Sequence, residues 1–499
     1  MAEFDSATYH TAAARRKRRF ILSACMMAQF MAAVESTIVG TAMPTIVADL
    51  GGFHLFSWVF ASYLLAQAVS TPIYGRLADI YGRKRVFIAG ATLFMVASAA
   101  CGFASSMVPL IVMRTIQGLG AGAIQPIAWT VLGDVYEPRE RATVQSYLSA
   151  VFGASALAGP LLGGFIVEHL HWELVFWVNI PITIAAMVML AVFLTERLGT
   201  DRQEVDYLGA GLLMVGAGAM MVVLVQARSL DSTTIFVLLA LALVSLAGLA
   251  FQEKRTPEPI VPFKLWRKPI IVVGNIGSFV IGVLMMCNGA FLPTYVQGAM
   301  GASPAEAGLA LGASSVMWTV GTVGAARLMV RSSYRAAAVV GGLIMVAGAL
   351  ALLTVNPSYG AFWAASAAAI LGLGMGYSNT TYVVSVQTSV GWSERGAATS
   401  ANLFLRTIGQ SIGTALFGAV FNFGMAQQVA GADDEINLLM QPATRLELGA
   451  DEVARLSTAI GDSIHSVYLM AGVLTIVLLG LAFCIQAGLS PVRQPAAGE

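Results

Sequence analysis

Three charged residues lie well inside long apolar runs of this sequence, away from the ends of those runs: Glu35, Arg114 and Arg406. A charged side chain in apolar surroundings is costly unless it is paired or serves a function. Glu35 lies about 15 residues into its run, or roughly 22 Å of helix, and Arg114 about 5 residues, or roughly 8 Å, into another. In antiparallel helices that cross an apolar layer of about 30 Å, the two side chains reach the same level. A carboxyl group beside a guanidinium there is a candidate for binding and releasing a proton. The alternative is a fixed ion pair that only orders the two helices.

Four runs carry polar residues at helical spacing, which is typical of side chains that line a cavity between helices. The alternative for each residue is an interhelical hydrogen bond. Arg406 is harder to explain in that way, since it lies roughly 12 Å into its run. One hypothesis is that it meets an acidic group of a ligand. The candidates for the cavity lining are Tyr63, Gln67, Gln117, Gln125, Tyr377, Asn402, Arg406 and Gln410.

The composition identifies the environment of these residues. Of the 499 residues, 57% are hydrophobic and 11% are charged, and the mean hydropathy is +0.76. Soluble domains carry about 25% charged residues, and a soluble core of this length cannot bury so much apolar surface. Fourteen spanning helices at about 20 residues each would account for the excess. The sequence therefore predicts an all-α polytopic membrane protein.

The same counts exclude several functions. A net charge of +1 gives no basic face for nucleic acid, and no lysine stands in a phosphate-binding loop, so we expect neither nucleic acid nor nucleotide as a partner. The four cysteines are scattered through apolar runs, which argues against a metal site. The five histidines lie at termini, loops or run ends, which disfavours a membrane-embedded enzyme or a channel. We expect no cofactor and no metal.

The distribution of positive charge predicts the topology. With the N-terminus in the cytoplasm, inner segments hold 22 of the 28 Lys and Arg residues, outer loops hold three, and the spans hold the other three. This asymmetry follows the positive-inside rule and places both termini in the cytoplasm. The fourteen runs are 20–42, 55–74, 86–104, 109–132, 143–167, 173–195, 206–226, 234–251, 270–292, 305–329, 336–354, 360–386, 398–424 and 464–487.

An internal repeat predicts the domain organisation. Gly118, Gly120 and Gly122 recur 254 residues later as Gly372, Gly374 and Gly376. Two related halves with a site between them are typical of alternating-access transporters. The predicted parts are a cytoplasmic tail at 1–19, a six-helix bundle at 20–195, two inserted helices at 206–251, a cytoplasmic linker at 252–269, a second six-helix bundle at 270–487 with a long outer loop at 425–463, and a cytoplasmic tail at 488–499.

Local motifs resemble those of a known family. The segment GRLADIYGRKR lies at Gly75 to Arg85, RTIQGLGAG lies at Arg114 to Gly122, and a glycine-rich stretch follows Gly153. Together with the region after Glu35, they resemble the major facilitator superfamily, and specifically its fourteen-span drug:proton antiporter family of multidrug efflux transporters. That resemblance covers essentially the whole chain. It departs from the family pattern at Glu35, where family members usually have Asp.

The resemblance implies a proton-coupled antiporter that exports lipophilic or amphipathic small molecules and confers drug resistance. It implies a major facilitator fold with two inserted helices, with the lipid bilayer, protons and small molecules as partners. Composition and the tight loops are typical of a bacterial protein, so we expect a location in the inner (plasma) membrane. We also expect a monomer. The resemblance assigns proton coupling to Glu35 and Arg114. It assigns a cytoplasmic gate to Gly75, Asp79, Gly82, Arg83 and Lys84. The antiporter motif consists of Gly153, Gly159, Pro160, Gly163 and Gly164.

Each assignment has an alternative. The gate charges could serve only orientation, and the antiporter motif could be ordinary helix packing. Two other functions remain open. A proton-coupled uptake symporter has the same fold as a multidrug exporter, and a dedicated exporter of one metabolite, lipid, siderophore or antibiotic transports in the same direction. One acid against two bases in the spans provides poorly for a dication, so we expect neutral, zwitterionic or monovalent substrates. In the outer loop, Val453, Leu456 and Ile460 have helical spacing, but we expect a folded loop.

Overall fold

The computed structural model describes residues 12–136, 138–196, 206–226, 230–256, 266–391, 395–429, 433–440, 445 and 448–485. Within these ranges the chain is helical apart from short turns and contains no strand. Residues 1–11 of the predicted tail at 1–19, the predicted tail at 488–499, and residues 257–265 of the predicted linker at 252–269 lie outside the described residues. Residues 12–19 belong to the first helix.

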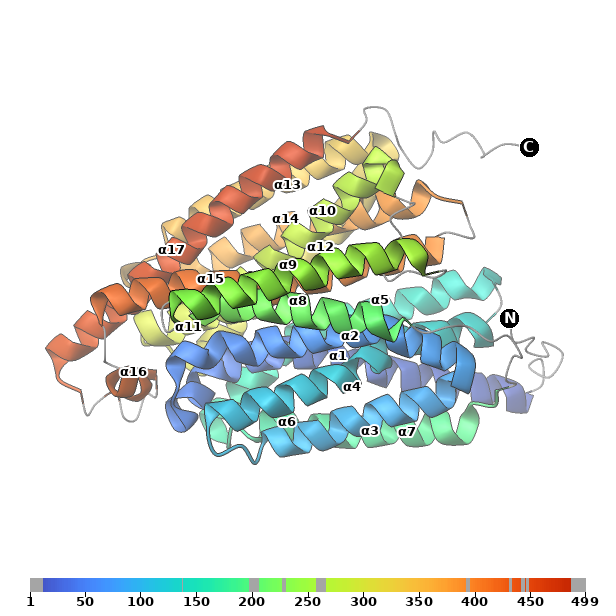
Figure 1. Ribbon diagram of the computed structural model, residues 1–499, viewed down its shortest axis with the longest axis horizontal. Helices are drawn as coiled ribbons and strands as arrows, with labels where there is room; N and C mark the ends of the chain where they lie inside the picture. The colour runs from blue at the N-terminus through green and yellow to red at the C-terminus, as the bar shows by residue number, and fades with distance from the viewer. Residues whose placement is uncertain are drawn as a thin grey trace.

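Seven helices of the described chain form the N-terminal half of the molecule (Figure 1). They are α1 (Ala12–Leu50), α2 (Phe56–Tyr81), α3 (Arg83–Cys101), α4 (Met107–Val135), α5 (Pro138–His169), the short α6 (Leu174–Trp177) and α7 (Asn179–Phe193). Six of them are long enough to cross a bilayer or nearly so, and α6 leads directly into α7.

The C-terminal half repeats this pattern with more irregular backbone. Its helices are α10 (Pro269–Met286), α11 (Leu292–Thr294), α12 (Pro304–Arg331), α13 (Tyr334–Leu353), α14 (Gly360–Thr388), α15 (Arg395–Gln428), α16 (Asp433–Met440) and α17 (Ala450–Phe483). Two π-helical turns, Cys287–Phe291 and Tyr295–Ala299, extend α10 through α11 to about Ala299.

Thirteen helices among the described residues are long and apolar enough to span a membrane. The remaining predicted span, 143–167, lies in α5, a 32-residue helix whose first turn includes Glu140. Its length suffices for a crossing. The helix content and the long apolar helices confirm a polytopic all-α membrane protein, and the count is consistent with fourteen spans.

Glycines of the repeat make equivalent contacts in the two halves. A Cβ on Gly118 would lie 2.3 Å from the Tyr63 carbonyl oxygen of α2, and one on Gly372 would lie 2.2 Å from the Ser314 oxygen of α12. Gly120 and Gly374 approach α3 and α13 in the same way. Only glycine permits these backbone approaches. The helices α4 and α14 therefore occupy corresponding positions in two related bundles.

The two halves meet mainly at one end of the bundle. We call the end at which α1 begins and α17 ends the inner end, and the opposite end the outer end. At the outer end the Gln297 amide donates to the Thr41 carbonyl (3.0 Å), and the Asn422 amide donates to the His54 carbonyl (3.0 Å). Towards the inner end the C-terminal helices tilt away from the N-terminal ones (Figure 1).

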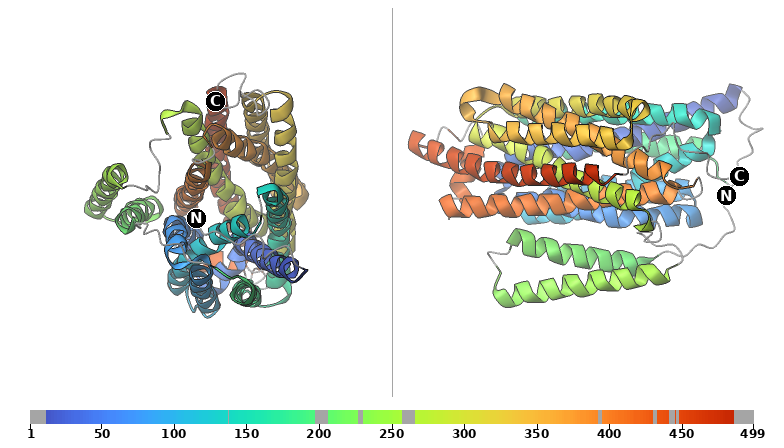
Figure 2. Two further views of the ribbon diagram at one scale, coloured as in Figure 1. Left: turned by 90° about the vertical axis from the view of Figure 1, so that its right-hand side faces the viewer. Right: turned by 90° about the horizontal axis from the view of Figure 1, so that it is seen from above.

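The inserted helices α8 (Tyr207–Gln226) and α9 (Ser232–Arg255) form a hairpin beside the bundle (Figure 2). Helix α8 packs on α2 and α15, where buried Met221 contacts the Ser411 hydroxyl. Helix α9 is largely exposed and begins at Asp231, whose carboxylate caps it by accepting from the Thr234 amide. This hydrogen bonding lowers the pKa of Asp231 below its usual value.

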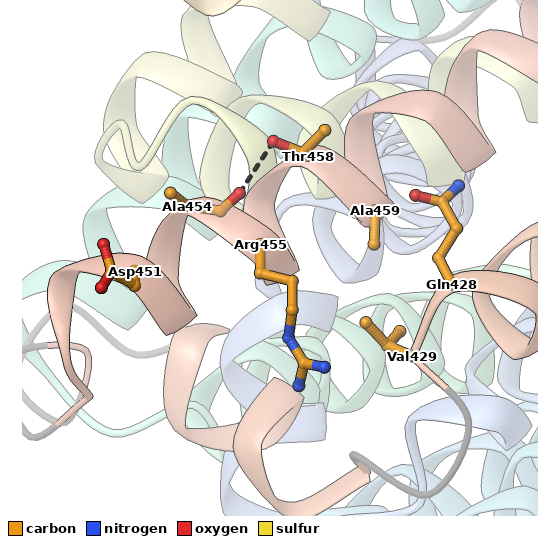
Figure 3. Close-up of a pocket in the computed structure, with 7 residues that line it drawn as sticks. All are labelled: Gln428, Val429, Asp451, Ala454, Arg455, Thr458 and Ala459. Atoms are coloured by element: carbon orange, nitrogen blue, oxygen red, sulfur yellow. Dashed lines mark hydrogen bonds between the residues drawn. The ribbon is translucent and has the colours of Figure 1, made fainter.

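The outer segment differs from the expected loop. Residues Ala450–Ile464 are helical and continue without a break into the last spanning helix, as α17. Leu456 and Ile460 are fully buried, so the helical spacing of these apolar residues decides the structure in favour of helix. Between α17 and the end of α15 lies a surface hollow of about 570 Å³, lined by Gln428, Val429, Asp451, Ala454, Arg455, Thr458 and Ala459 (Figure 3).

Candidate functional site

Glu35 is fully buried in the N-terminal half, and its carboxylate is held by two side chains. Its Oε1 forms an ion pair with the Arg114 guanidinium of α4, and its Oε2 accepts a hydrogen bond from the Asn179 amide of α7 (2.5 Å). Neither Glu35 nor Arg114 is more than 2% exposed. The structure thus brings together the two residues that the sequence places at one level, and three helices converge on one carboxylate.

Arg114 is in turn fully engaged. Its guanidinium donates to the side-chain amide oxygen of Gln117 (2.7 Å) and to the Val59 backbone carbonyl (3.3 Å), and it lies 4.0 Å from the centre of the Tyr63 ring. Gln117 donates to the Ser98 hydroxyl of α3 (3.1 Å). The cluster formed by Glu35, Arg114, Gln117, Tyr63, Asn179 and Ser98 is named here the carboxylate network.

Asn179 and Ser98 are absent from the sequence-based candidates. Asn179 is the first residue of α7 and Ser98 stands alone in an apolar stretch of α3, so neither belongs to a polar stripe. The signal available in the sequence was a polar residue inside an apolar run, since Asn179 lies in 173–195 and Ser98 in 86–104.

The gate residues tie the turn between α2 and α3 to neighbouring helices of the same half. Gly82 has a positive φ of 93°, a conformation that favours glycine. Arg83 pairs with Asp134 at the end of α4, and the Lys84 ammonium donates to the Leu194 carbonyl beyond α7 (3.2 Å). Gly75 has open space around its Cβ position, and the Asp79 side chain lies outside the described residues.

The antiporter-motif glycines allow close packing on both sides of α5. A Cβ on Gly159 would lie 2.0 Å from the Thr37 hydroxyl of α1, and one on Gly163 would lie 2.1 Å from that of Thr41. On the other side, a Cβ on Gly164 would lie 2.7 Å from the Pro304 carbonyl of α12. Pro160 faces Gly308 of α12 in the same interface, and Gly153 lies outside the described side chains. The motif therefore lies where the two halves meet.

The predicted cavity residues separate into two groups. Tyr63 and Gln117 belong to the carboxylate network, and Asn402 is buried in hydrogen bonds to Ser278, Asn275 and the Gly274 carbonyl of α10. Partly exposed positions make up the second group: Gln67, Gln125, Tyr377, Arg406 and Gln410. In that group the Tyr377 hydroxyl lies close to Gly324 of α12.

The sequence matches one family model over most of its length. The model of the Major Facilitator Superfamily matches residues 25–414, which include the carboxylate network and the gate residues. The chain belongs to the Major Facilitator Superfamily. It is thus a multi-pass membrane transporter.

Similar members of the superfamily are bacterial multidrug transporters. The chain is 34% identical over 409 residues to the multidrug transporter protein MdtP of Bacillus subtilis, covering 81% of this chain and 76% of that protein. It is 31% identical over 479 residues to multidrug resistance protein 3 of the same organism, covering 92% and 94%. A bacterial homologue of the human lysosomal transporter Spinster, solved in an inward-facing and unoccupied conformation, shares the fold with a TM-score of 0.68 at 15% identity, covering 94% and 96%.

Proposed function

We propose that this superfamily member is a proton-coupled antiporter that exports lipophilic or amphipathic small molecules from a bacterial cell. The observation that carries the proposal is the fully buried Glu35 carboxylate, held by Arg114 and Asn179. Glu35 belongs to α1, the helix that contacts the antiporter-motif glycines of α5. A charge held at membrane depth is costly, and a proton-coupling role accounts for its presence.

In this proposal the described conformation is open towards the cytoplasm. The halves contact each other at the outer end, through α5 with α12 and through α15 with α2, so a substrate enters from the inner end. Because Glu35 is sealed from solvent while its carboxylate is paired, proton uptake requires the network to open. Protonation of Glu35 from the outer side removes its attraction to Arg114, and this difference between the two states links proton binding to conformation.

The driving force is sufficient for export. A membrane potential of about 100 mV supplies roughly 2.3 kcal/mol per charge moved. For a neutral substrate exchanged with one proton, this sustains a concentration ratio of tens-fold, and a pH gradient adds to it.

The test uses purified protein in liposomes that contain a pH-sensitive dye and an acidic interior. Lipophilic compounds added outside should trigger proton efflux in the wild type and not in Glu35→Gln. Asp49→Asn is the matched control, since Asp49 is an exposed carboxylate near the outer end of the same helix, bonded to Trp172. Glu35→Gln that still exchanges protons for substrate contradicts the proposal, and proton movement in the direction of the substrate indicates an uptake symporter. A response to a single compound class indicates a dedicated exporter.

A further inference from the structure

Two arginines lie deep in the spanning helices, and the structure treats them differently. Arg114 is neutralised by Glu35 and shares its remaining donors with Gln117, the Val59 carbonyl and the Tyr63 ring. Arg406 pairs with no carboxylate in the part of the chain that the structure describes. A guanidinium at membrane depth without a counter-ion is costly, so its retention requires another explanation.

The guanidinium of Arg406 has one edge available. Its Nη1 donates to the Asn379 amide oxygen of α14 (3.3 Å), which is the hydrogen bond that this side chain makes to the described residues. Its Nε is buried and has no partner. Nε and Nη2 form the planar edge to which a carboxylate binds through two parallel hydrogen bonds. Arg406 is therefore oriented by an amide, and its carboxylate-binding edge has no hydrogen-bond partner among the described residues.

The position of Arg406 on α15 places it between the two contact faces of that helix. Asn402 bonds to α10, and Ser411 donates to the Ala61 carbonyl of α2 (2.8 Å). At 100° per residue, Arg406 and Gln410 fall on the arc between these faces, and both are partly exposed.

The chemistry of this arc argues against contact with lipid tails. Side chains that face lipid are apolar, as at Val316, Val320 and Val323 on α12, which are 43–50% exposed. The arc instead carries a guanidinium and an amide about 11 residues, or roughly 16 Å, from the start of α15. An arc of this chemistry suits the space between the two halves better than a lipid-facing surface, at a depth reached from the inner end.

We propose that Arg406 and Asn379 form a subsite for the acidic group of the substrate, and that the exported compounds therefore include amphipathic monocarboxylates. This inference rests on the proposed export function and adds the substrate class. The carboxylate binds the Nε and Nη2 edge of Arg406, and the apolar part of the molecule lies along the passage.

Binding of a matched pair of probes tests the subsite. Dansyl-phenylalanine is an amphipathic monocarboxylate, and its methyl ester is neutral and nearly the same size. The full-length protein in phosphatidylcholine nanodiscs should bind the acid at least about ten-fold more tightly than the ester, as charge-assisted bidentate hydrogen bonds predict. Arg406→Gln should reduce this preference to about one, while affinity for the ester stays and reports correct folding.

Two further variants test whether the preference for the acid depends on the free edge of Arg406 or only on the presence of a positive charge. Asn379→Asp supplies Arg406 with an internal carboxylate, so it should abolish the preference for the acid without changing the residue's size. Arg327→Gln removes an exposed arginine near the end of α12 and should leave the preference unchanged. Equal wild-type affinity for the two probes, no measurable affinity for the acid, or a preference that persists in Arg406→Gln overturns the subsite.

The source of the anion is also distinguished. If anionic phosphatidylglycerol in the nanodiscs abolishes the preference, a lipid headgroup occupies the subsite and the substrate assignment is wrong. If the ester drives proton exchange in liposomes while the protein shows no preference for the acid, the proposed subsite is wrong and the proposed function stands. If no compound drives proton exchange through Glu35, the proposed function itself fails.

Discussion

Glu35 and Arg114 depend on each other, because each would be an isolated charge in the interior without its partner. The Asn179 amide supports the carboxylate, and the Tyr63 ring lies against the guanidinium. Removing one member of a buried ion pair is far more costly than replacing both, since the remaining charge loses its compensation.

Arg114→Gln should therefore destabilise the protein by about 3–5 kcal/mol, whereas the double variant Glu35→Gln/Arg114→Gln should recover much of that loss. The measurement is the apparent melting temperature in detergent, with Arg327→Gln as the exposed-arginine control. A double variant that melts at or below the temperature of Arg114→Gln contradicts the buried-pair interpretation.

The site is only partly predictable from single residues. Helical rise from opposite ends places Glu35 and Arg114 at one level, and the structure pairs them; their proton role remains a prediction. Asn179 is not predictable, because its role depends on which helices are neighbours and not on any spacing within α7. The polar stripe on α15 predicts a cavity position for Asn402, but its amide is buried against α10.

Among the helices, α5 and α12 hold the outer end together through backbone contact. A Cβ on Gly308 would lie 2.4 Å from the Pro160 carbonyl oxygen, and the nearest atoms belong to backbone that cannot rotate away. The ring of Pro160 fixes φ at that residue, so the backbone of α5 has little freedom to adjust there. The close approach of the two helices therefore depends on the absence of a side chain at Gly308.

Gly308→Ala should force α5 and α12 apart and increase passive proton leak through the reconstituted protein. Gly480→Ala is the control, because a Cβ there has nothing within 4 Å, and alanine favours helix over glycine by about 1 kcal/mol. The measurement is the decay of an imposed pH gradient in liposomes without substrate. Equal decay for the two variants would show that this contact does not seal the outer end.

The positions of the spanning helices follow largely from composition and periodicity, but how far each helix continues beyond its apolar run does not. Apolar runs locate the spanning helices to within several residues, yet α1 extends well before residue 20 and α17 begins near 450. The extension of α1 contains five consecutive basic residues, and that of α17 is amphipathic, so hydropathy detects neither. The expected outer loop was wrong for this reason.

At the scale of the whole molecule, the proposed function predicts that the two related halves change their contacts during transport. The described conformation is closed at the outer end, where Ser57 of α2 meets Gly418 of α15, and a Cβ on Gly418 would lie 2.7 Å from that of Ser57. Disulfides join Cβ atoms about 3.5–4.5 Å apart, so a small outward shift accommodates one.

In a background without the four native cysteines, Ser57→Cys/Gly418→Cys should cross-link on oxidation and stop transport, and reduction should restore it. Binding from the inner end should persist, because the cross-link holds the conformation that is open there. Oxidised Ser57→Cys alone is the control. A cross-linked protein that transports at the uncross-linked rate contradicts alternating access between these halves.

Protonation of Glu35 is the most direct test of proton-coupled transport in this protein. Infrared difference spectra between high and low pH, recorded in reconstituted membranes, resolve the carbonyl band of a buried protonated carboxyl group. We predict such a band in the wild type and in Asp49→Asn, and its loss in Glu35→Gln. Identical spectra for Glu35→Gln and the wild type would show that Glu35 never takes up the proton, and would contradict its role in coupling.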